Sequence, residues 1–334
     1  MRKKEEHKTE REKVEERREE VLAKGRKFKY PLQYAKHRVI LLTMIVAVVV
    51  IGALAGLGYL SLYKWNTTND MIYRLTRVLP VSVAKIDGEK VRYSDYLLIY
   101  KSSITPIEKQ QGKLDDSEDS ENMRNHYKRA ALTEAEDYAY AMKLARGLGI
   151  TIDDAAVDKA IEEHRKVGGV ERSQDSFEKI IKDNFDLSIR EYRRLVYLSL
   201  VKAEVSKQID THAQELVDEV AQKLKKNNGD MSAIAKEMEG SISYEETGGL
   251  VDKMNVDGGR SAVAMSLEKG RISEPVISTN GDGYYFVKLI DKNSYSVNYA
   301  SIKVPFEEFR KRVETMIKSE KVKERIHFPE EKTE

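Results

Sequence analysis

The stretch from Gly283 to Val304, GYYFVKLIDKNSYSVNYASIKV, is the clearest strand signal in this chain. Two runs, Tyr284–Ile290 and Val297–Val304, mix β-branched and aromatic residues with polar ones, as half-buried strands do. Polar residues that favour turns, Asp291 to Ser294, separate them. The stretch therefore predicts a β-hairpin near the end of a chain whose other patterns are mostly helical.

The composition is typical of a soluble, helix-rich protein with one local exception. Of the 334 residues, 34% are charged and 40% hydrophobic, and the chain is longer than one ordinary domain. There is no cysteine, which excludes zinc fingers, disulfide scaffolds and thiol catalysis. Residues 1–38 carry 14 Lys and Arg against 8 Asp and Glu, a net charge of +6, and the remainder carries −4. A slightly acidic folded part argues against nucleic acid as a partner.

The local exception is Val39 to Tyr63, which contains 25 residues and no charge. As a helix it would span roughly 38 Å, enough to cross a hydrocarbon core of about 30 Å. A cleavable signal peptide has a shorter apolar region that ends in small residues, so an uncleaved signal anchor is favoured. Basic residues precede the segment without acids among them: Lys24, Arg26, Lys27, Lys29, Lys36 and Arg38. The positive-inside rule predicts a single-pass cell-membrane protein with a cytoplasmic N-terminus and extracytoplasmic C-terminal domains.

Six parts are expected along the chain. They are a charged cytoplasmic tail (1–38), a transmembrane helix (39–63), a juxtamembrane linker (64–80), a helical domain (81–210), an α+β domain (211–304), and a C-terminal helix and tail (305–334). The helical domain should open with a strand at Val81–Ile86, an Asp87-Gly88 turn, and a helix capped by Ser94. Ser188 and Glu191 fit a capping box for its last helix. The final helix is predicted over Pro305–Ile326 from its apolar spacing. The fold class is α+β, with a small antiparallel sheet backed by helices.

Several phrases, in the right order, resemble one family. VAKIDGEKVRYSDYL, LGITIDDAAVDKAI and FDLSIREYRRLV resemble the helical chaperone domain of SurA-like proteins. GDMSAIAKEM, TGGLVDKM and AMSLEKGRISEPVISTNGDGYYFVKL are similar to the parvulin, or PpiC-type peptidyl-prolyl isomerase (rotamase), domain. Membrane-anchored foldases such as PrsA and PpiD share this plan. The resemblance implies partners that are unfolded or proline-containing exported polypeptides.

Isomerisation of an X–Pro bond needs an apolar proline pocket and polar groups that favour the twisted amide; it needs no metal, nucleophile or cofactor. The resemblance places two histidines on adjacent central strands, with a Met or Leu and a Phe in the pocket. Here one histidine position falls on Tyr285, the pocket Phe on or near Arg260, and the aliphatic pocket residue on Val256. Met265 and Tyr299 are the other candidate substrate-binding residues, and Tyr299, like Tyr285 and Ser301, could supply a hydroxyl.

The family's first strand has no counterpart before residue 211, where VKAEVSKQID has the pattern of a helix end. VNYASIKV in the opening hairpin has the pattern of that missing strand, with Ser301 in place of the second histidine. Two interpretations remain open. The hairpin's second arm replaces the first strand, which amounts to a circular permutation, or it is an appended edge strand outside the site.

Because Tyr285 and Ser301 stand at the two histidine positions, three functional hypotheses remain open. The first is a membrane-anchored extracytoplasmic chaperone whose parvulin-like domain has weak or no isomerase activity. The second is an active peptidyl-prolyl isomerase that uses hydroxyls such as those of Tyr285 and Ser301. The third is an envelope scaffold. His212 is expected at the surface at a helix start, and no His, Asp and Glu cluster has the spacing of metal ligands.

Overall fold

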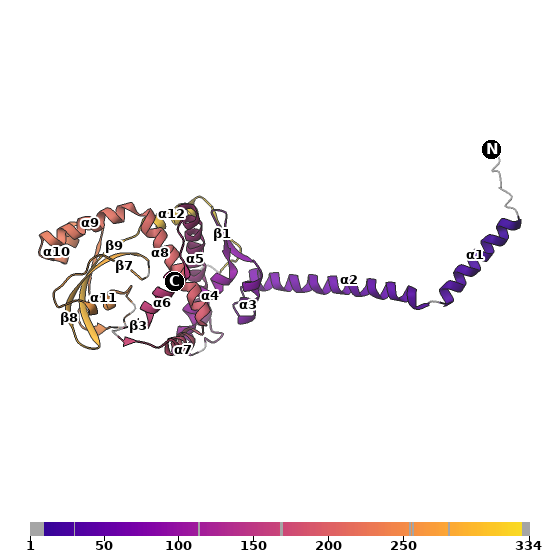
Figure 1. Ribbon diagram of the computed structural model, residues 1–334, viewed down its shortest axis with the longest axis horizontal. Coiled ribbons are helices and arrows are strands. Elements are labelled where there is room, and N and C mark those ends of the chain that lie inside the picture. Colours follow the sequence, from indigo (N-terminus) through magenta and orange to yellow (C-terminus); the bar gives the residue numbers. More distant parts are fainter. Residues whose placement is uncertain are drawn as a thin grey trace, which may run out of the picture. The chain divides into compact units, whose positions relative to one another are not determined.

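The computed structural model describes residues 10–29, 31–112, 114–167, 170–253, 255, 257–279 and 281–328, and its contacts divide the chain into two units, Met1–Trp65 and Asn66–Glu334. The first unit contains helices α1 (Glu10–Lys29) and α2 (Pro31–Tyr59), and a π-helical turn η1 (Leu60–Lys64) (Figure 1). Side chains from Arg38 to Leu57 are exposed, and the Thr43 hydroxyl donates to the Val39 carbonyl at 2.8 Å. By length and composition, Arg38–Lys64 could cross a membrane, in agreement with the predicted segment.

The second unit begins with a helical lobe. Its α-helices are α3 (Asp70–Val78), α4 (Tyr93–Gln111), α5 (Glu118–Leu148), α6 (Asp154–Arg165), α7 (Gln174–Phe185) and α8 (Ile189–Ile209). Its short strands are β1 (Ser82–Ile86), β2 (Glu89–Arg92), β3 (Lys166–Val167) and β4 (Val170–Glu171). The longest helix, α5, packs against α4 and α8, and buries an alternation of small and aromatic side chains between them.

Local capping signals place most of these helices correctly. The predicted capping box is present at Ser188, whose side chain accepts from the Glu191 backbone while the Glu191 side chain accepts from the Ser188 N–H. The predicted Ser94 cap is wrong, because α4 begins at Tyr93 with Arg92 in the cap position. The Tyr93 N–H donates to the Val81 carbonyl at 3.1 Å, so strand β2 passes directly into the helix and Ser94 lies in its first turn.

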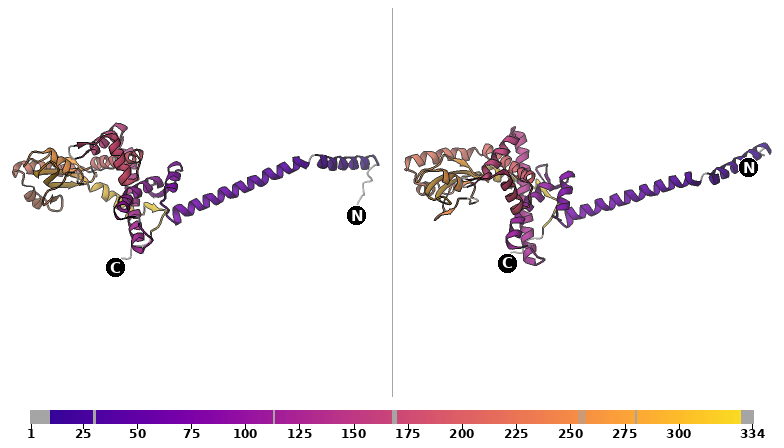
Figure 2. Two further views of the ribbon diagram at one scale, coloured as in Figure 1. Left: turned by 90° about the horizontal axis from the view of Figure 1, so that it is seen from below. Right: turned by 60° about the horizontal axis from the view of Figure 1, so that its bottom comes forward.

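The predicted C-terminal helix is present, but its predicted bounds, 305–326, are wrong. Helix α12 spans only Glu308–Lys318, and Glu320 then adopts a left-handed backbone conformation with φ +54°. The chain continues as strand β10 (Val322–Glu324), which pairs antiparallel with β1 in the order β10–β1–β2. Glu324 accepts two 2.7 Å hydrogen bonds from Arg129 of α5. The C-terminal strand therefore lies beside the first hairpin of the helical lobe (Figure 2).

The second lobe is a small antiparallel sheet between helices. Its helices are α9 (Thr211–Lys226), α10 (Met231–Glu237) and α11 (Arg260–Ser266). Its strands are β5 (Ser243–Glu246), β6 (Val251–Asp252), β7 (Val276–Ile277), β8 (Gly283–Lys292) and β9 (Ser296–Pro305). The strand order is β5–β9–β8–β7, with β6 also pairing with β9. Helices α9 and α10 cover one face of the sheet and α11 the other.

The predicted hairpin is confirmed as β8 and β9, and its second arm is an inner strand. Strand β9 pairs with β8 on one side and with β5 and β6 on the other, so the interpretation as an appended edge strand is wrong. The segment before residue 211, where the family's first strand has no counterpart in the sequence, is helical, since α8 runs to Ile209. The hairpin lies at the centre of the sheet, and helices cover both of its faces. Its apolar side chains are therefore buried on both faces.

Asp210 and Gly281 lie at contacts between the lobes. The buried Asp210 carboxylate accepts from the Ala213 N–H at 2.9 Å at the start of α9, and from Glu307 and Glu308 N–H at 2.7 and 3.0 Å at the start of α12. The turn before β8 abuts α8, because a Cβ at Gly281 would stand 2.9 Å from the Ala203 Cβ. Gly281 also has φ +67°, which favours glycine for its conformation as well as its size.

A buried carboxyl in α5 makes the stability of the helical lobe depend on pH. Glu136 is 6% exposed, and its Oε1 has no hydrogen-bond partner among the described residues. Burial, reinforced by nearby Glu324, raises its pKa to about 8. The native state therefore holds a proton that the unfolded chain has lost, so the free energy of unfolding should fall by roughly 1.4 kcal/mol per pH unit between about pH 4.5 and 8.

Glu136→Gln should remove this pH dependence, so the free energy of unfolding of the variant relative to that of the wild type should rise by about 3–4 kcal/mol between pH 5 and pH 8. Urea unfolding of the full chain in nonionic detergent between pH 5 and 9 measures the free energy of unfolding of both proteins. Glu314→Gln on the exposed side of α12 is the control and should change the free energy of unfolding by less than about 0.5 kcal/mol. If the free energy of unfolding changed equally with pH in the wild type and in Glu136→Gln, Glu136 would not be the source of the pH dependence.

Candidate functional site

One face of the sheet, beneath α11, holds most of the residues that sequence comparison with the family singled out. Tyr285 on β8 and Ser301 on β9 point to this face, since residue 285 pairs with 303 and residue 287 with 301 in the β8–β9 ladder. Both are buried, at 4% and 1% exposure. Tyr299 lies two residues before Ser301 on the same face and is 3% exposed. The predicted site residues on the two inner strands are therefore neighbours.

Arg260, the first residue of α11, covers these side chains. Its guanidinium carbon lies 4.9 Å from the centre of the Tyr285 ring and 5.9 Å from that of Tyr299. The Arg260 Nη1 donates to Ser301 Oγ at 3.3 Å and to the Glu245 carboxylate of β5, while Nε donates to the Asp257 carbonyl at 2.9 Å. A guanidinium thus lies beside Tyr285 and Ser301, the two positions where the resemblance predicts the family's histidines.

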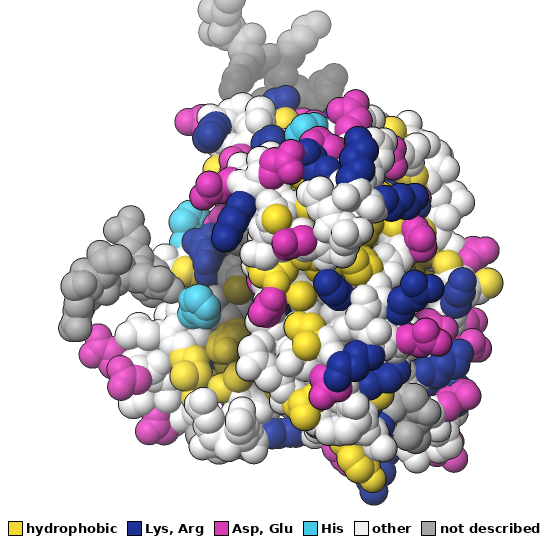
Figure 3. Space-filling model, turned by 90° about the vertical axis from the view of Figure 1, so that its left-hand side faces the viewer, with side chains coloured by type: hydrophobic (Ala, Val, Ile, Leu, Met, Phe, Trp, Pro, Cys, Tyr) yellow, Lys and Arg dark blue, Asp and Glu magenta, His cyan; other side chains and the backbone are white. Residues whose placement is uncertain are grey.

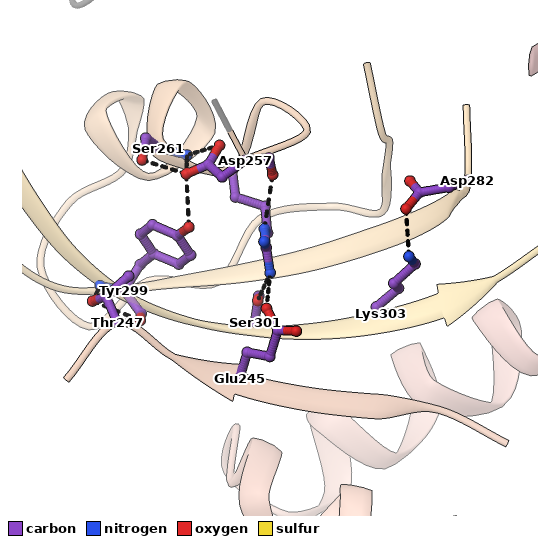
Figure 4. Close-up of polar contacts among 9 residues, drawn as sticks. Glu245, Thr247, Asp257, Ser261, Asp282, Tyr299, Ser301 and Lys303 are labelled. Atoms are coloured by element: carbon purple, nitrogen blue, oxygen red, sulfur yellow. Dashed lines mark hydrogen bonds and ion pairs between the residues drawn. The ribbon is translucent and has the colours of Figure 1, made fainter. Parts of the chain in front are cut away.

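An aspartate that the sequence argument did not single out holds α11 on the sheet. The Asp257 Oδ2 accepts 2.7 Å and 2.5 Å hydrogen bonds from the hydroxyls of Tyr299 and Ser261, and the Ser261 N–H also donates to the carboxylate (Figure 4). Burial, followed by the hydrogen bond to Asp257, raises the pKa of Tyr299. Tyr299 is therefore a neutral hydrogen-bond donor with a fixed acceptor.

Lys303 forms a second polar contact beside this cluster. Its ammonium pairs with the Asp282 carboxylate and lies 5.8 Å from the centre of the Tyr285 ring (Figure 4). Tyr285 is thus flanked by two cations, Arg260 and Lys303, whose charges favour the electron-rich ring faces. This arrangement stabilises the packing of α11 and of the β7–β8 turn.

Met265 and Val256 are the two remaining predicted site residues. Met265 is half-buried on α11 and packs against the apolar cluster that includes Val287 and Leu289, so it belongs to the interior of this layer. Val256 lies outside the described residues. His212 is exposed at the start of α9, as expected. Among the described residues, no group of three His, Asp or Glu is arranged to hold a metal ion.

Asp257 could have been found from the sequence as a local capping signal. The phrase Asp257-Gly-Gly-Arg-Ser261 places a carboxylate four residues before a serine at a helix start, and both glycines adopt positive φ. The bond from Tyr299 to Asp257 is non-local and depends on the position of β9 in the sheet.

A second feature is an apolar groove between the helical lobe and the end of β7, which we call the inter-lobe groove. It has a volume of about 640 Å³. Its walls come from α4, α5, α6, α8 and the β7 turn: Ile99, Ser102, Glu134, Tyr138, Ile152, Ala156, Ala160, Glu163, His164, Tyr192, Leu195, Val196, Ser199, Leu200, Ala203, Glu204, Ile277, Ser278 and Thr279. Ile277, at 38% exposure, presents an aliphatic side chain to it from the sheet.

The groove keeps an uncharged histidine in its wall. The Tyr192 hydroxyl is 2.8 Å from His164 Nδ1, and the Tyr192 ring packs edge-on against Phe177 at 5.6 Å between centres. Burial lowers the pKa of His164, so the imidazole is neutral at pH 7. Three carboxylates, those of Glu134, Glu163 and Glu204, reach the groove, and no Lys or Arg among the described residues lines it. The groove is therefore mainly apolar, and two of its three carboxylates are paired with lysines outside the lining, Glu163 with Lys166 and Glu204 with Lys207.

Two models of known protein families match this chain. A model of the SurA-like N-terminal domain matches residues 32–196, and a model of the PPIC-type PPIase (rotamase) domain matches residues 198–291. The chain has the domain plan of the SurA-like foldases, in which a helical chaperone domain is joined to a parvulin-type domain. This is the plan of SurA, PrsA and PpiD, as predicted from the sequence. No curated protein matches the chain.

Proposed function

We propose that this protein is a membrane-anchored extracytoplasmic chaperone that holds unfolded exported polypeptides in the inter-lobe groove, and that its parvulin-like domain has weak or no isomerase activity. The observation that carries the proposal is the groove itself, an apolar concavity of about 640 Å³ at the junction of the two family domains. Grooves of this size and lining suit aliphatic and aromatic side chains of an extended client.

Several features of the surface support weak, tolerant binding. Hydrophobic side chains gather in the middle of one face of the protein, among Lys, Arg, Asp and Glu side chains (Figure 3). The groove wall combines small residues, such as Ala156 and Ser199, with Tyr138 and Tyr192, so clients of different shape can fit.

The membrane anchor and its orientation belong to the proposal. The support is the apolar helix Arg38–Lys64 together with the basic residues that precede it. In this arrangement residues 1–38 are cytoplasmic and the second unit faces the exported chains. Burial in lipid suits the exposed aliphatic surface of α2, which would otherwise be in water.

The sheet face beneath α11 favours weak isomerase activity. Arg260 lies over the rings of Tyr285 and Tyr299 on this face and donates a hydrogen bond to Ser301. A desolvated guanidinium, already paired with Glu245, is a poor wall for a proline ring. The permuted position of β9, supported by its place inside the sheet, keeps the fold while the two histidine positions hold Tyr285 and Ser301. The second candidate, an active isomerase, is favoured by the rotamase-family match.

Two assays on the full chain in nonionic detergent separate these candidates. With a proline-containing tetrapeptide, we expect a rate within about twofold of the uncatalysed rate, unchanged in Tyr285→Phe and Ser301→Ala. Acceleration that both variants abolish would favour the isomerase. In the second assay, the protein should suppress aggregation of several unrelated unfolded proteins. Suppression limited to one partner would instead support an envelope scaffold.

A further inference from the structure

A second cavity lies in the helical lobe at the meeting of α3, the start of α4 and the start of α8. It has a volume of about 260 Å³ and is lined by Tyr73, Arg77, Arg92, Ser94, Asp95, Leu98, Arg190, Glu191 and Arg194. We call it the arginine cavity. Four guanidinium groups and two carboxylates give its lining a net charge of +2. It shares no lining residue with the inter-lobe groove and has no part in the proposed client binding.

The two carboxylates are already paired. Arg194 holds Asp95 in a bidentate pair, with Nε–Oδ1 at 3.2 Å and Nη2–Oδ2 at 2.7 Å. Arg77 lies 3.6 Å from Glu191, whose carboxylate also accepts hydrogen bonds from the Ser188 N–H and hydroxyl at 2.8 and 2.7 Å. These carboxylates therefore have little capacity left to neutralise further cations at the cavity.

The two remaining cations are the unusual part of the cavity. Arg92 and Arg190 are both exposed, and within the described parts of the chain neither forms an ion pair. Each belongs to a helix start, since Arg92 is the cap residue of α4 without a side-chain capping bond, and Arg190 is in the first turn of α8. The positive ends of two helices thus add to two uncompensated guanidinium groups.

We propose that the arginine cavity binds a phosphate group, with the phosphodiester headgroup of an anionic phospholipid as its ligand. Guanidinium groups form paired hydrogen bonds with phosphate oxygens, and the net positive charge of the lining attracts the single negative charge of a phosphodiester. A volume of about 260 Å³ accommodates a phosphate with a small polyol substituent but not a folded partner.

The position of the cavity in the chain favours a lipid over a soluble phosphate compound. Eight residues separate Lys64, at the end of the apolar helix, from Tyr73 in the cavity wall. If the apolar helix spans a membrane, as proposed above, this short tether keeps the cavity within reach of the headgroup layer. Headgroup binding would then fix the helical lobe at the membrane surface.

The test uses the full chain in nonionic detergent and calorimetric titration with two soluble probes. The first is glycerophosphoglycerol, the headgroup of phosphatidylglycerol, and the second is inorganic phosphate. We expect the headgroup to bind, with an affinity that falls by at least about tenfold in Arg92→Gln/Arg190→Gln and falls with added salt. Arg310→Gln, which removes an exposed arginine of α12 far from the cavity in sequence, should leave binding unchanged.

Circular dichroism and the melting temperature establish that each variant is folded. Binding of inorganic phosphate alone, lost in the double variant, would keep the phosphate site but assign it to soluble phosphate compounds. No binding of either probe, or equal binding by wild type and the folded double variant, would overturn the proposal. Because client binding is measured separately by aggregation suppression, either result leaves the chaperone proposal to its own test.

Discussion

Replacing Ala160 by Trp should reduce suppression of client aggregation by at least about tenfold while the protein remains folded. Ala160 lies on α6, is half-buried and lines the inter-lobe groove opposite residues of α8. An indole at this position would fill the apolar volume that a client side chain needs. Because the groove is open at one side, the indole can be accommodated without forcing α6 away from the lobe.

Ala155→Trp provides a matched control for this substitution. Ala155 lies on the same helix, is exposed, and is not part of the groove lining. It adds the same indole to the surface and should suppress aggregation as well as the wild type does. Equal activity of Ala160→Trp and the wild type would show that clients bind elsewhere.

The largest loss of stability is expected for Asp210→Ala. This buried carboxylate accepts three backbone N–H bonds, one at the start of α9 and two at the start of α12, and so it caps helices on both sides of the lobe junction. One lost helix cap costs about 1–2 kcal/mol, and the two further charge-assisted bonds raise the expected loss to about 3–5 kcal/mol. Urea unfolding in nonionic detergent measures the loss.

Asp230→Ala is the control, because Asp230 caps only α10 through a 3.0 Å bond from the Ala233 N–H and is exposed. Its expected cost is about 1 kcal/mol. Asp210→Asn should lie between the two, because an amide oxygen can still accept from Ala213 while its NH₂ group cannot accept from Glu307 and Glu308. Similar losses for Asp210→Ala and Asp230→Ala would contradict the role of Asp210 at both helices.

The sequence was most informative where the determinant is local. The capping box at Ser188, the Asp87-Gly88 turn and the β8–β9 hairpin each depend on residues within a few positions of one another, and all three are present. The resemblance to the family also came from such local phrases in their order. Tyr285, Ser301 and Arg260 were singled out in this way, and the sheet brings them together.

The parts that were missed depend on distant segments. Strand β10 forms because β1 offers an unpaired edge and Arg129 offers a partner to Glu324, and neither is near it in sequence. The amphipathic spacing of residues 305–326 therefore favoured a helix longer than the one that forms. Asp210 was unremarkable as a sequence position, since its bonds to α12 cross 97 residues of chain. The arginine cavity likewise combines three helices.

The central claim is that clients occupy the inter-lobe groove and do not bind the exposed apolar residues of the sheet lobe. The most direct test replaces Leu200 of the groove wall, and in a second protein the exposed Leu250 of the sheet lobe, by an aliphatic photo-crosslinking amino acid of similar size. Illumination in the presence of an unfolded client should give crosslinks at position 200 that excess unlabelled client removes, with few at position 250. Crosslinks at position 250 and none at position 200 would contradict the account.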